Sequence, residues 1–348
     1  MATFYPVHIK EIRQETANAV SVVFDIPEDL NSKFHFTAGQ YITLQKKING
    51  KEVRRAYSIC TSPKDNEIRV AIKAVENGTF SVYATTQLKV NDPIEVSAPE
   101  GRFLLDSEAN KNYIGFAAGS GITPLLSMVK TVLSAELSSN FTLVYGNRSV
   151  VDTIFYKELN SLKESYPERF KLHYIFSRED VKNELRGRID QNVTNYFVKN
   201  MYKETAFDAA FLCGPEEMIH QVSDTLERAK IKKENIHFEL FTANTDETTA
   251  SKIKEGTTEV TVLLDDEETN FTMKQTDDIL SASLRNNIDA PYSCQGGVCS
   301  SCLGKITTGK AVMVKNSILT DSEIEEGFVL TCQAHPTTPE ISIDFDDV

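Results

Sequence analysis

Four cysteines near the C-terminal end of the chain constrain this sequence more than any other feature. Cys294, Cys299 and Cys302 are spaced C-x4-C-x2-C, and Cys332 follows much later. This is the ligand spacing of a [2Fe–2S] cluster, in which two irons share four thiolates. The two glycines between the first two cysteines let one loop wrap the cluster closely and bring backbone N–H groups near the inorganic sulfides. The sequence therefore predicts a cluster held by these four cysteines, with Cys332 reaching the second iron from another part of the fold.

Two other uses of the cysteines stay open: a structural zinc site and a disulfide framework. Structural zinc is usually held by paired C-x2-C units, and this sequence has only one such pair. Six cysteines, four of them in the cluster pattern, favour a reducing cytoplasm over a disulfide framework. The first residues lack the basic and apolar regions of a signal peptide, and no apolar run approaches the ~20 residues of a membrane span. We expect a cytoplasmic protein without membrane insertion.

Length and charge exclude further classes. A chain of 348 residues has room for two or three domains with packed cores. Its hydrophobic content of 41% and charged content of 25% are ordinary for a globular protein. The formal net charge of −13 argues against binding to nucleic acid or to an anionic membrane surface. It is compatible with docking onto a basic protein partner.

Short apolar-alternating runs, broken by Gly, Pro, Asn and Asp, dominate the first part of the chain up to about Phe103. Such runs predict an antiparallel β-barrel. One predicted strand contains Arg55-Ala-Tyr57-Ser58, where alternation places Arg55 and Tyr57 on one face and Ser58 on the other. Taken alone, this segment could be any half-buried strand. The other strands are expected at 19–24, 41–44 and 68–73.

Strands and helices alternate in the middle of the chain, which predicts a parallel sheet. The first of these strands leads into Gly119-Ser-Gly121-Ile-Thr123-Pro124 and an apolar helix from Leu125. A strand, a glycine turn and a helix N-terminus form a general pyrophosphate cradle. By itself the motif is a weak match, because Pro124 stands where G-x-G-x-x-G has its third glycine. The strands are expected at 113–118, 141–145, 171–176 and 209–213, with helical segments near 155–159 and 217–222.

These motifs, in this order, resemble the ferredoxin–NADP⁺ reductase superfamily. In the first domain the resemblance rests on the segments 36–41, 55–58, 78–81 and 98–103. It implies that Arg55 contacts the flavin phosphate, that Tyr57 lies against the isoalloxazine, and that Ser58 lies near its reactive N5 edge. A turn at 78–81 is implied to supply backbone N–H and hydroxyl donors to the pyrophosphate. FAD is the implied flavin, with FMN as the alternative. The implied flavin-binding residues are Arg55, Ala56, Tyr57, Ser58, Gly78, Phe80, Ser81 and, near the ring, Phe241.

In the second domain the resemblance implies a nicotinamide-nucleotide site. Ser177-Arg178 is similar to the pair that holds the 2′-phosphate in NADPH-using relatives, so NADPH is favoured over NADH. Arg148, and Arg186 or Arg188, could add charge there, although an exposed arginine is the alternative for each. The remaining implied nucleotide contacts are Gly119, Gly121, Thr123, Pro124, Gly214 and Pro215.

Three residues are implied to lie at the reacting edge: Ser58, Cys213 and Glu239. Cys213 opens Cys-Gly-Pro, which resembles the superfamily's second nucleotide signature, where the strand end faces the nicotinamide. It could equally be a buried core thiol. Glu239 lies in the segment 236–241, which in the superfamily ends the nucleotide domain near the flavin ring, although the sequence would also permit a plain edge strand.

The last part of the chain resembles a plant-type ferredoxin. Residues 242–252 have almost no apolar content and are expected to form a flexible tether. Strands at 259–264 and 270–274 and a helix at 278–286 precede the cysteine loop. The expected fold is multidomain, α+β and α/β. It combines an antiparallel flavin-binding β-barrel (1–107), a parallel α/β nicotinamide-nucleotide domain (108–243), a linker (244–256) and a β-grasp ferredoxin domain (257–348).

This domain order resembles the reductase components of multicomponent oxygenases, and among them those that serve phenylacetyl-CoA epoxidases of phenylacetate catabolism. The resemblance implies an oxidoreductase that passes electrons from NADPH through FAD and the [2Fe–2S] cluster to a partner oxygenase. One alternative is the same electron-transfer chain serving another acceptor, such as a desaturase, a hydroxylase or a hybrid-cluster protein. A non-catalytic electron carrier with a vestigial nucleotide domain is the other.

Overall fold

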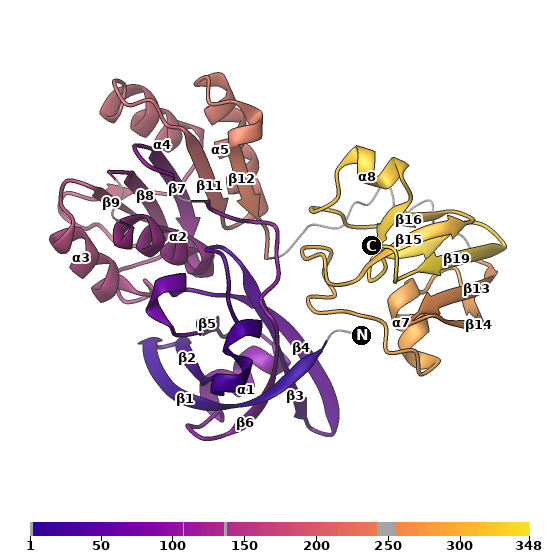
Figure 1. The fold of residues 1–348 in the computed structure, drawn as a ribbon. Coiled ribbons are helices and arrows are strands. Elements are labelled where there is room, and N and C mark those ends of the chain that lie inside the picture. Colours follow the sequence, from indigo (N-terminus) through magenta and orange to yellow (C-terminus); the bar gives the residue numbers. More distant parts are fainter. Residues whose placement is uncertain (1–2, 107, 136–137, 242–252, 254) are drawn as a thin grey trace. The chain divides into compact units, whose positions relative to one another are not determined.

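The computed structural model describes residues 3–106, 108–135, 138–241, 253 and 255–348. They form two compact units, one from Phe4 to Phe241 and one that contains the C-terminal part of the chain (Figure 1). The predicted tether at 242–252 lies outside the described residues. Within the described residues, no helix is both long and apolar enough to cross a membrane.

An antiparallel six-stranded sheet begins the first unit, in the order β4-β3-β6-β1-β2-β5. The sheet closes on itself, because Ile59, directly after β4, bridges to Val70 of β5, at the opposite edge of the sheet. The predicted antiparallel barrel is therefore present. Its strands are β1 Phe4–Thr16, β2 Ala19–Asp25, β3 Tyr41–Ile48, β4 Lys51–Ser58, β5 Arg69–Lys73 and β6 Pro93–Ser97.

The barrel encloses an apolar core and carries one helix, α1 (Thr79–Thr86). The expected turn at 78–81 is instead the start of this helix, with Gly78 as its N-cap residue. Phe80 and Ala84 lie on one face of α1 and are buried in the barrel core, which extends the turn into a helix. Two short 3₁₀ helices, η1 (Glu28–Lys33) and η2 (Pro63–Asp65), complete this part.

A parallel six-stranded sheet follows, in the order β10-β9-β8-β7-β11-β12. It confirms the predicted α/β domain. The strands are β7 Asn112–Ala118, β8 Asn140–Asn147, β9 Phe170–Phe176, β10 Leu185–Arg186, β11 Ala209–Cys213 and β12 Ile236–Glu239. The order turns back beside β7, so the loops after β7 and β11 open at one edge, the place where ligands bind in such sheets.

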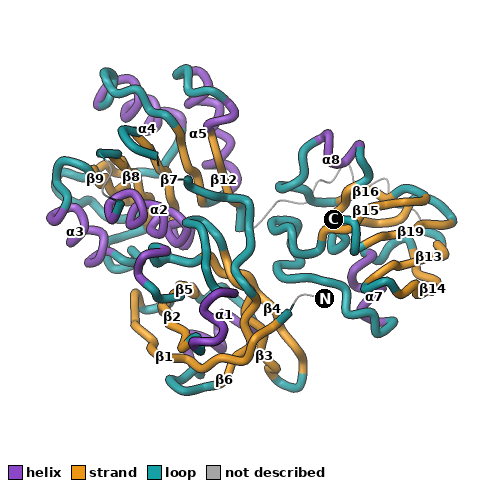
Figure 2. The backbone as a smooth tube through the Cα atoms, viewed as in Figure 1, coloured by secondary structure: helices purple, strands orange, loops and turns teal. Residues whose placement is uncertain are grey.

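Helices cover both faces of this sheet (Figures 1 and 2). Crossovers between parallel strands are right-handed as a rule, which with this strand order puts α2 and α3 on one face and α5 on the other, where α5 packs against α4. Helix α2 starts at Ile122, three residues before the expected Leu125, directly after the 3₁₀ turn η3. The bounds are η3 Gly119–Gly121, α2 Ile122–Ser134, α3 Tyr156–Ser165, α4 Gln191–Asn195, the π-helical turn η4 Tyr196–Met201, α5 Glu216–Arg228 and η5 Lys233–Asn235.

The C-terminal unit is a five-stranded sheet, in the order β14-β13-β19-β15-β17, with a helix packed on its core. Strands β13 and β19 pair parallel and the other neighbours antiparallel, as expected of a β-grasp fold. The elements are β13 Thr257–Leu264, β14 Glu267–Lys274, α7 Ile279–Arg285, β15 Leu303–Thr308, α8 Asp321–Glu325, β17 Phe328–Leu330 and β19 Glu340–Asp344, with a two-stranded ribbon of β16 Ala311–Met313 and β18 Ala334–Pro336.

Candidate functional site

Ser58 and Glu239 meet although 181 residues separate them. Ser58 is the last residue of β4 and Glu239 the last of β12, and the Ser58 hydroxyl donates a hydrogen bond of 3.1 Å to Glu239 Oε2. Burial raises the pKa of Glu239 to about 8, while the bond from Ser58 acts in the opposite direction. The carboxyl group therefore carries a proton at neutral pH, at the junction of the barrel and the parallel sheet.

Cys213 lies beside this pair. It ends β11 and stands opposite Glu239 in the register of β11 and β12. Burial, and to a smaller degree the charge of Glu239, raises the pKa of the Cys213 thiol well above its usual value. A thiol held neutral in this way is no nucleophile at neutral pH. Its backbone carbonyl explains the glycine in the next loop, because a Cβ on Gly121 would lie only 2.1 Å from the Cys213 oxygen.

The predicted pyrophosphate cradle is a tight turn at the start of α2. Gly119 has a φ of +56°, which glycine adopts without strain. The Tyr145 hydroxyl donates to the Gly119 carbonyl at 2.8 Å, and the Thr123 hydroxyl donates to the Ser120 carbonyl at 3.0 Å. No described side chain caps the N-terminus of this 13-residue helix. Its first-turn N–H groups and helix dipole are thus suited to an anionic phosphate, which fits a dinucleotide.

The proposed flavin residues line the barrel beside α1. The rings of Tyr57 and Phe80 pack at a centroid distance of 5.7 Å, and burial raises the pKa of the Tyr57 phenol. Arg55 is half-buried and donates to the Arg54 carbonyl at 2.6 Å, which leaves other guanidinium N–H groups for a phosphate. The Ser81 hydroxyl accepts from the Val75 N–H at 3.2 Å. An aromatic surface with a partly exposed arginine in the same strand fits a flavin nucleotide.

The candidate 2′-phosphate residues lie on two adjacent loops, after β8 and β9. The Ser177 N–H donates to the Asn147 carbonyl and the Arg178 N–H to the Arg148 carbonyl, each at 2.9 Å. Both arginine side chains are exposed. The Glu179 carboxylate accepts from the Val150 N–H at 2.7 Å and joins the two loops again. Two exposed cations on paired backbones fit a phosphate group better than either would alone.

The remaining predicted nucleotide and flavin residues lie at separate places in the first unit. Arg186 lies in β10 opposite Phe176, next to the paired loops, and Arg188 is exposed beyond it. Pro215 caps α5 after Gly214, where an added Cβ would lie 3.1 Å from the Ala118 side chain. Phe241, at the end of the first unit, is 38% exposed. An exposed aromatic ring of this kind is available to a flat ligand.

Sequence reasoning missed Lys73. It ends β5 of the barrel, yet its Nζ lies 3.7 Å from the position that a Cβ on Gly119 would take, in the cradle of the parallel sheet. Burial, and then the positive charge of Arg148, lower the pKa of Lys73. A desolvated cation beside another cation favours an anionic ligand between them. The signal in the sequence was weak: a lysine that ends an apolar strand just before the turn at Gly78.

The four cluster cysteines gather in the C-terminal unit. Cys294 is in hydrogen-bond contact with Cys299 and Cys332, and Cys332 also with Cys302. The Gly296 N–H donates to the Cys294 sulfur at 3.3 Å. These bonds from Cys299 and Cys332 lower the pKa of the Cys294 thiol, while the same contacts raise the pKa of the Cys299 and Cys332 thiols. The loop thus stabilises negative charge on sulfur, as an iron–sulfur cluster requires.

The contacts connect the four thiols in the order Cys299, Cys294, Cys332 and Cys302. Within the described residues, no group of three or more His, Cys, Asp or Glu side chains is arranged to hold a single metal ion. Four thiols in one continuous chain of contacts suit a cluster in which each of two irons takes two thiolates. Gln333, which sequence reasoning also missed, fixes the loop. Its amide nitrogen donates to the Gln295 carbonyl at 3.1 Å and lies 3.7 Å from the Cys332 sulfur.

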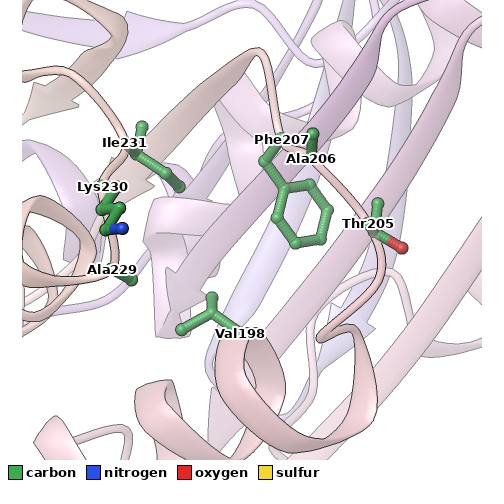
Figure 3. A pocket seen from close by; sticks show the side chains of 7 residues that line it. All are labelled: Val198, Thr205, Ala206, Phe207, Ala229, Lys230 and Ile231. Atoms are coloured by element: carbon green, nitrogen blue, oxygen red, sulfur yellow. The ribbon is translucent and has the colours of Figure 1, made fainter.

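A cavity of about 240 Å³ in the parallel-sheet domain lies away from these residues (Figure 3). Its lining comes from η4 and from the segments just before β11 and just after α5, so it lies at the amino ends of the strands, opposite the cradle. The lining residues are Val198, Thr205, Ala206, Phe207, Ala229, Lys230 and Ile231.

Comparison with known families assigns each part of the chain. Residues 6–104 match the oxidoreductase FAD-binding domain, and residues 116–224 match the oxidoreductase NAD-binding domain. Residues 262–337 match the 2Fe-2S iron-sulfur cluster binding domain. The chain is therefore an oxidoreductase with domains for FAD, a nicotinamide nucleotide and a [2Fe–2S] cluster.

Relatives match over nearly the whole length of the chain. The chain is 37% identical to one subunit of the 1,2-phenylacetyl-CoA epoxidase of Escherichia coli K12, over 99% of each chain. It is 30% identical to the ferredoxin reductase component of 3-ketosteroid-9-alpha-monooxygenase of Rhodococcus rhodochrous, over 97% of this chain and 95% of the relative. Among solved structures, phthalate dioxygenase reductase matches with a TM-score of 0.65 and 25% identity over 98% of each chain.

Proposed function

This chain belongs to the family of oxygenase reductases that combine an FAD-binding, a nicotinamide-nucleotide-binding and a [2Fe–2S] domain, and on this premise we propose that it delivers electrons from NADPH to a phenylacetyl-CoA epoxidase. The observation that carries the proposal is the 37% identity to a subunit of such an epoxidase over 99% of both chains. The 30% identity to a 3-ketosteroid monooxygenase component supports, as a second candidate, the same role toward a different oxygenase.

The cofactors supply the redox chemistry: bound NADPH provides a hydride, the flavin takes up two electrons and gives them out singly, and the cluster hands single electrons to the acceptor. The chain's own residues bind and orient these groups. Arg55 is suited to the flavin phosphate because its planar guanidinium can form two parallel hydrogen bonds. Tyr57 and Phe80 supply aromatic surface for the flavin.

Ser58 and Glu239 are proposed to hold a proton at the reacting edge. The Glu239 carboxyl is protonated at neutral pH because it is buried, and Ser58 fixes its orientation. Cys213, a neutral buried thiol beside Glu239, is proposed to shape the nicotinamide contact rather than to react. All three groups are buried, which supports a reacting edge that is shielded from water.

The cradle at Gly119 and Gly121 is proposed to bind the nucleotide pyrophosphate through the first-turn N–H groups of α2. Arg178, with Arg148 and Ser177, is proposed to bind the 2′-phosphate, which favours NADPH over NADH. The paired loops support this assignment because they hold both arginines on adjacent backbones.

Cys294 and Cys299 are proposed to hold one iron, and Cys302 and Cys332 the other. Cys294 contacts Cys299 and Cys332 contacts Cys302, while the further contact between Cys294 and Cys332 brings the two pairs together, which supports two irons in one cluster. All six cysteines, each of them described, are free thiols. We propose that the protein works in the reducing cytoplasm, where thiols stay available for a cluster.

An anaerobic titration of the purified protein with NADPH, and separately with NADH, tests the electron path. We expect flavin bleaching followed by a rhombic low-temperature EPR signal of the reduced cluster, at lower concentrations of NADPH than of NADH. Adding the purified phenylacetyl-CoA epoxidase and its substrate, phenylacetyl-CoA, should then give NADPH consumption that depends on the substrate. Bleaching and an EPR signal without that consumption would contradict the proposed acceptor, whereas no bleaching with either nucleotide would contradict the whole path.

A further inference from the structure

Helix α2 carries a row of polar residues on a face that points to the barrel. Ser127, Lys130, Thr131 and Ser134 follow one another at helical spacing, and we call them the polar stripe. Most other side chains of this helix are apolar and belong to the core of the parallel sheet. A fully buried polar residue such as Ser127 is costly unless it is bonded, so its presence in the stripe needs a partner.

The partners of the stripe are in the barrel, shortly after β4, which we call the flavin strand because it carries the proposed flavin residues Arg55, Tyr57 and Ser58. The Ser127 hydroxyl donates to the Thr61 carbonyl at 2.6 Å. The Thr131 hydroxyl contacts the Ser62 hydroxyl at 3.5 Å. Further along the helix, the Lys64 ammonium donates to the Ser134 carbonyl at 3.2 Å. The segment bonded here begins three residues after Ser58, while the helix begins at the nucleotide cradle.

An ion cluster around the buried Arg69 joins the barrel and the parallel-sheet domain as well. Arg69 of the barrel donates to both carboxylate oxygens of Glu158 in α3, at 2.8 and 2.9 Å. Lys130 of the stripe lies 2.6 Å from Glu158 and 3.7 Å from Asp65 of the barrel. The Arg69 side chain is only 4% exposed, and its guanidinium lies over the Phe155 ring at 5.1 Å. Hydrogen-bonded charges around a buried guanidinium are directional, so they fix an orientation that apolar packing would leave free to slide.

We infer that Ser127, Lys130 and Glu158 are positioning residues for hydride transfer: they set the register between the nucleotide cradle and the flavin strand. Hydride transfer requires the two reacting atoms to come within about 3 to 3.5 Å, and a shift of ~1 Å can slow such a step about 100-fold. The barrel supplies one reacting partner and α2 begins at the cradle for the other. Bonds along α2 therefore control this distance without touching either cofactor. The inference rests on the proposed use of NADPH and flavin.

The test compares Ser127→Ala and Glu158→Gln in the full-length, FAD-loaded protein by anaerobic stopped-flow reduction with NADPH. We expect the flavin-reduction rate at saturating NADPH to fall about 10- to 100-fold, with flavin content and the Kd for NADPH unchanged. NADPH deuterated at the transferred position should give a larger isotope effect than in the wild type, because hydride transfer becomes more limiting. The matched control is Thr225→Ala, which removes another buried hydroxyl of the same domain, bonded within α5 to Gln221.

Glu158→Gln leaves Arg69 buried without its counter-charge and could unfold the protein, in which case Ser127→Ala decides, since it removes only a neutral hydrogen bond. Wild-type rates and isotope effects in a folded, FAD-loaded Ser127→Ala protein would overturn the inference, as would an equal loss in Thr225→Ala. A weaker Kd for NADPH at an unchanged maximal rate would also overturn it. If the wild type itself is not reduced by NADPH, the proposed function fails and this inference with it.

Discussion

Replacing Glu239 with Gln tests the buried carboxyl at the reacting edge. Gln has nearly the same shape and still offers an oxygen to the Ser58 hydroxyl, but it cannot titrate. Burial raises the pKa of Glu239 from 4.5 to about 8. Between these two values the folded protein keeps a proton that the unfolded chain releases, so the free energy of unfolding falls as the pH rises and levels off above about pH 8.

The size of this effect follows from the same pKa values. Between the two pKa values, the free energy of unfolding falls by at most about 1.4 kcal/mol per pH unit. From pH 6 to pH 9, ionisation of this one group lowers the free energy of unfolding of the wild type by about 2.5 kcal/mol. The total is smaller than the maximal slope would give, because the fall slows as the folded carboxyl begins to ionise. For a unit of this size, that corresponds to a fall in Tm of about 5 to 10 °C. The Glu239→Gln protein should not show this fall in Tm, because Gln does not ionise.

The assay is thermal unfolding of the FAD-loaded protein, followed by the fluorescence of released flavin at a series of pH values. We expect the Tm of Glu239→Gln minus that of the wild type to rise by about 5 to 10 °C between pH 6 and pH 9. Glu204→Gln is the control, since the Glu204 side chain is 89% exposed. A Tm difference that stays constant with pH would refute a raised pKa at Glu239.

Four further substitutions test the other assignments. Cys299→Ser should abolish the cluster EPR signal yet keep NADPH-to-ferricyanide activity through the flavin; loss of both would show that the two centres are not separate. Arg178→Ala should raise the KM for NADPH at least about tenfold and leave that for NADH nearly unchanged, so an equal change for both nucleotides would remove Arg178 from the phosphate site. Lys73→Met should raise the KM for both nucleotides about tenfold, and unchanged values would place its ammonium outside the cradle. Gln333→Leu should lower the cluster's midpoint potential in an EPR-monitored redox titration, because an amide N–H near sulfur favours the more negative state; an unchanged potential would assign Gln333 to loop packing alone.

Local patterns predicted most of the fold. The expected strands at 68–73 and 171–176 correspond closely to β5 and β9, because buried apolar runs bounded by polar turns have few other stable conformations. The cysteine spacing likewise predicted the C-terminal fold, since only a close loop can bring three thiols to one cluster. Where a segment's neighbours in sequence are also its neighbours in space, pattern and structure agree.

Local sequence patterns did not predict the contacts between segments that lie far apart in the chain. Nothing near Ser58 indicates a bond to Glu239, and nothing near Arg69 indicates its pairing with Glu158, 89 residues away. The turn expected at 78–81 failed for a related reason: Gly and Ser favour turns locally, but burial of Phe80 in the barrel core favours the helix. Family resemblance placed Ser58 and Glu239 near one flavin ring, and the structure adds the hydrogen bond between them.

The two kinds of electron transfer make different demands on the chain, and the contacts are distributed accordingly. Hydride transfer moves a nucleus and needs near-contact distances, and the barrel and the parallel sheet are joined by directional bonds through α2 and Glu158. Transfer of a single electron needs no bond-forming approach, and the cluster domain is a separate unit with its own core. Linkage in one chain then suffices to keep the effective concentration of the two centres high. It follows that substitutions in the polar stripe should slow flavin reduction but not the reduction of the cluster by an already reduced flavin, while substitutions around Gln333 should do the reverse.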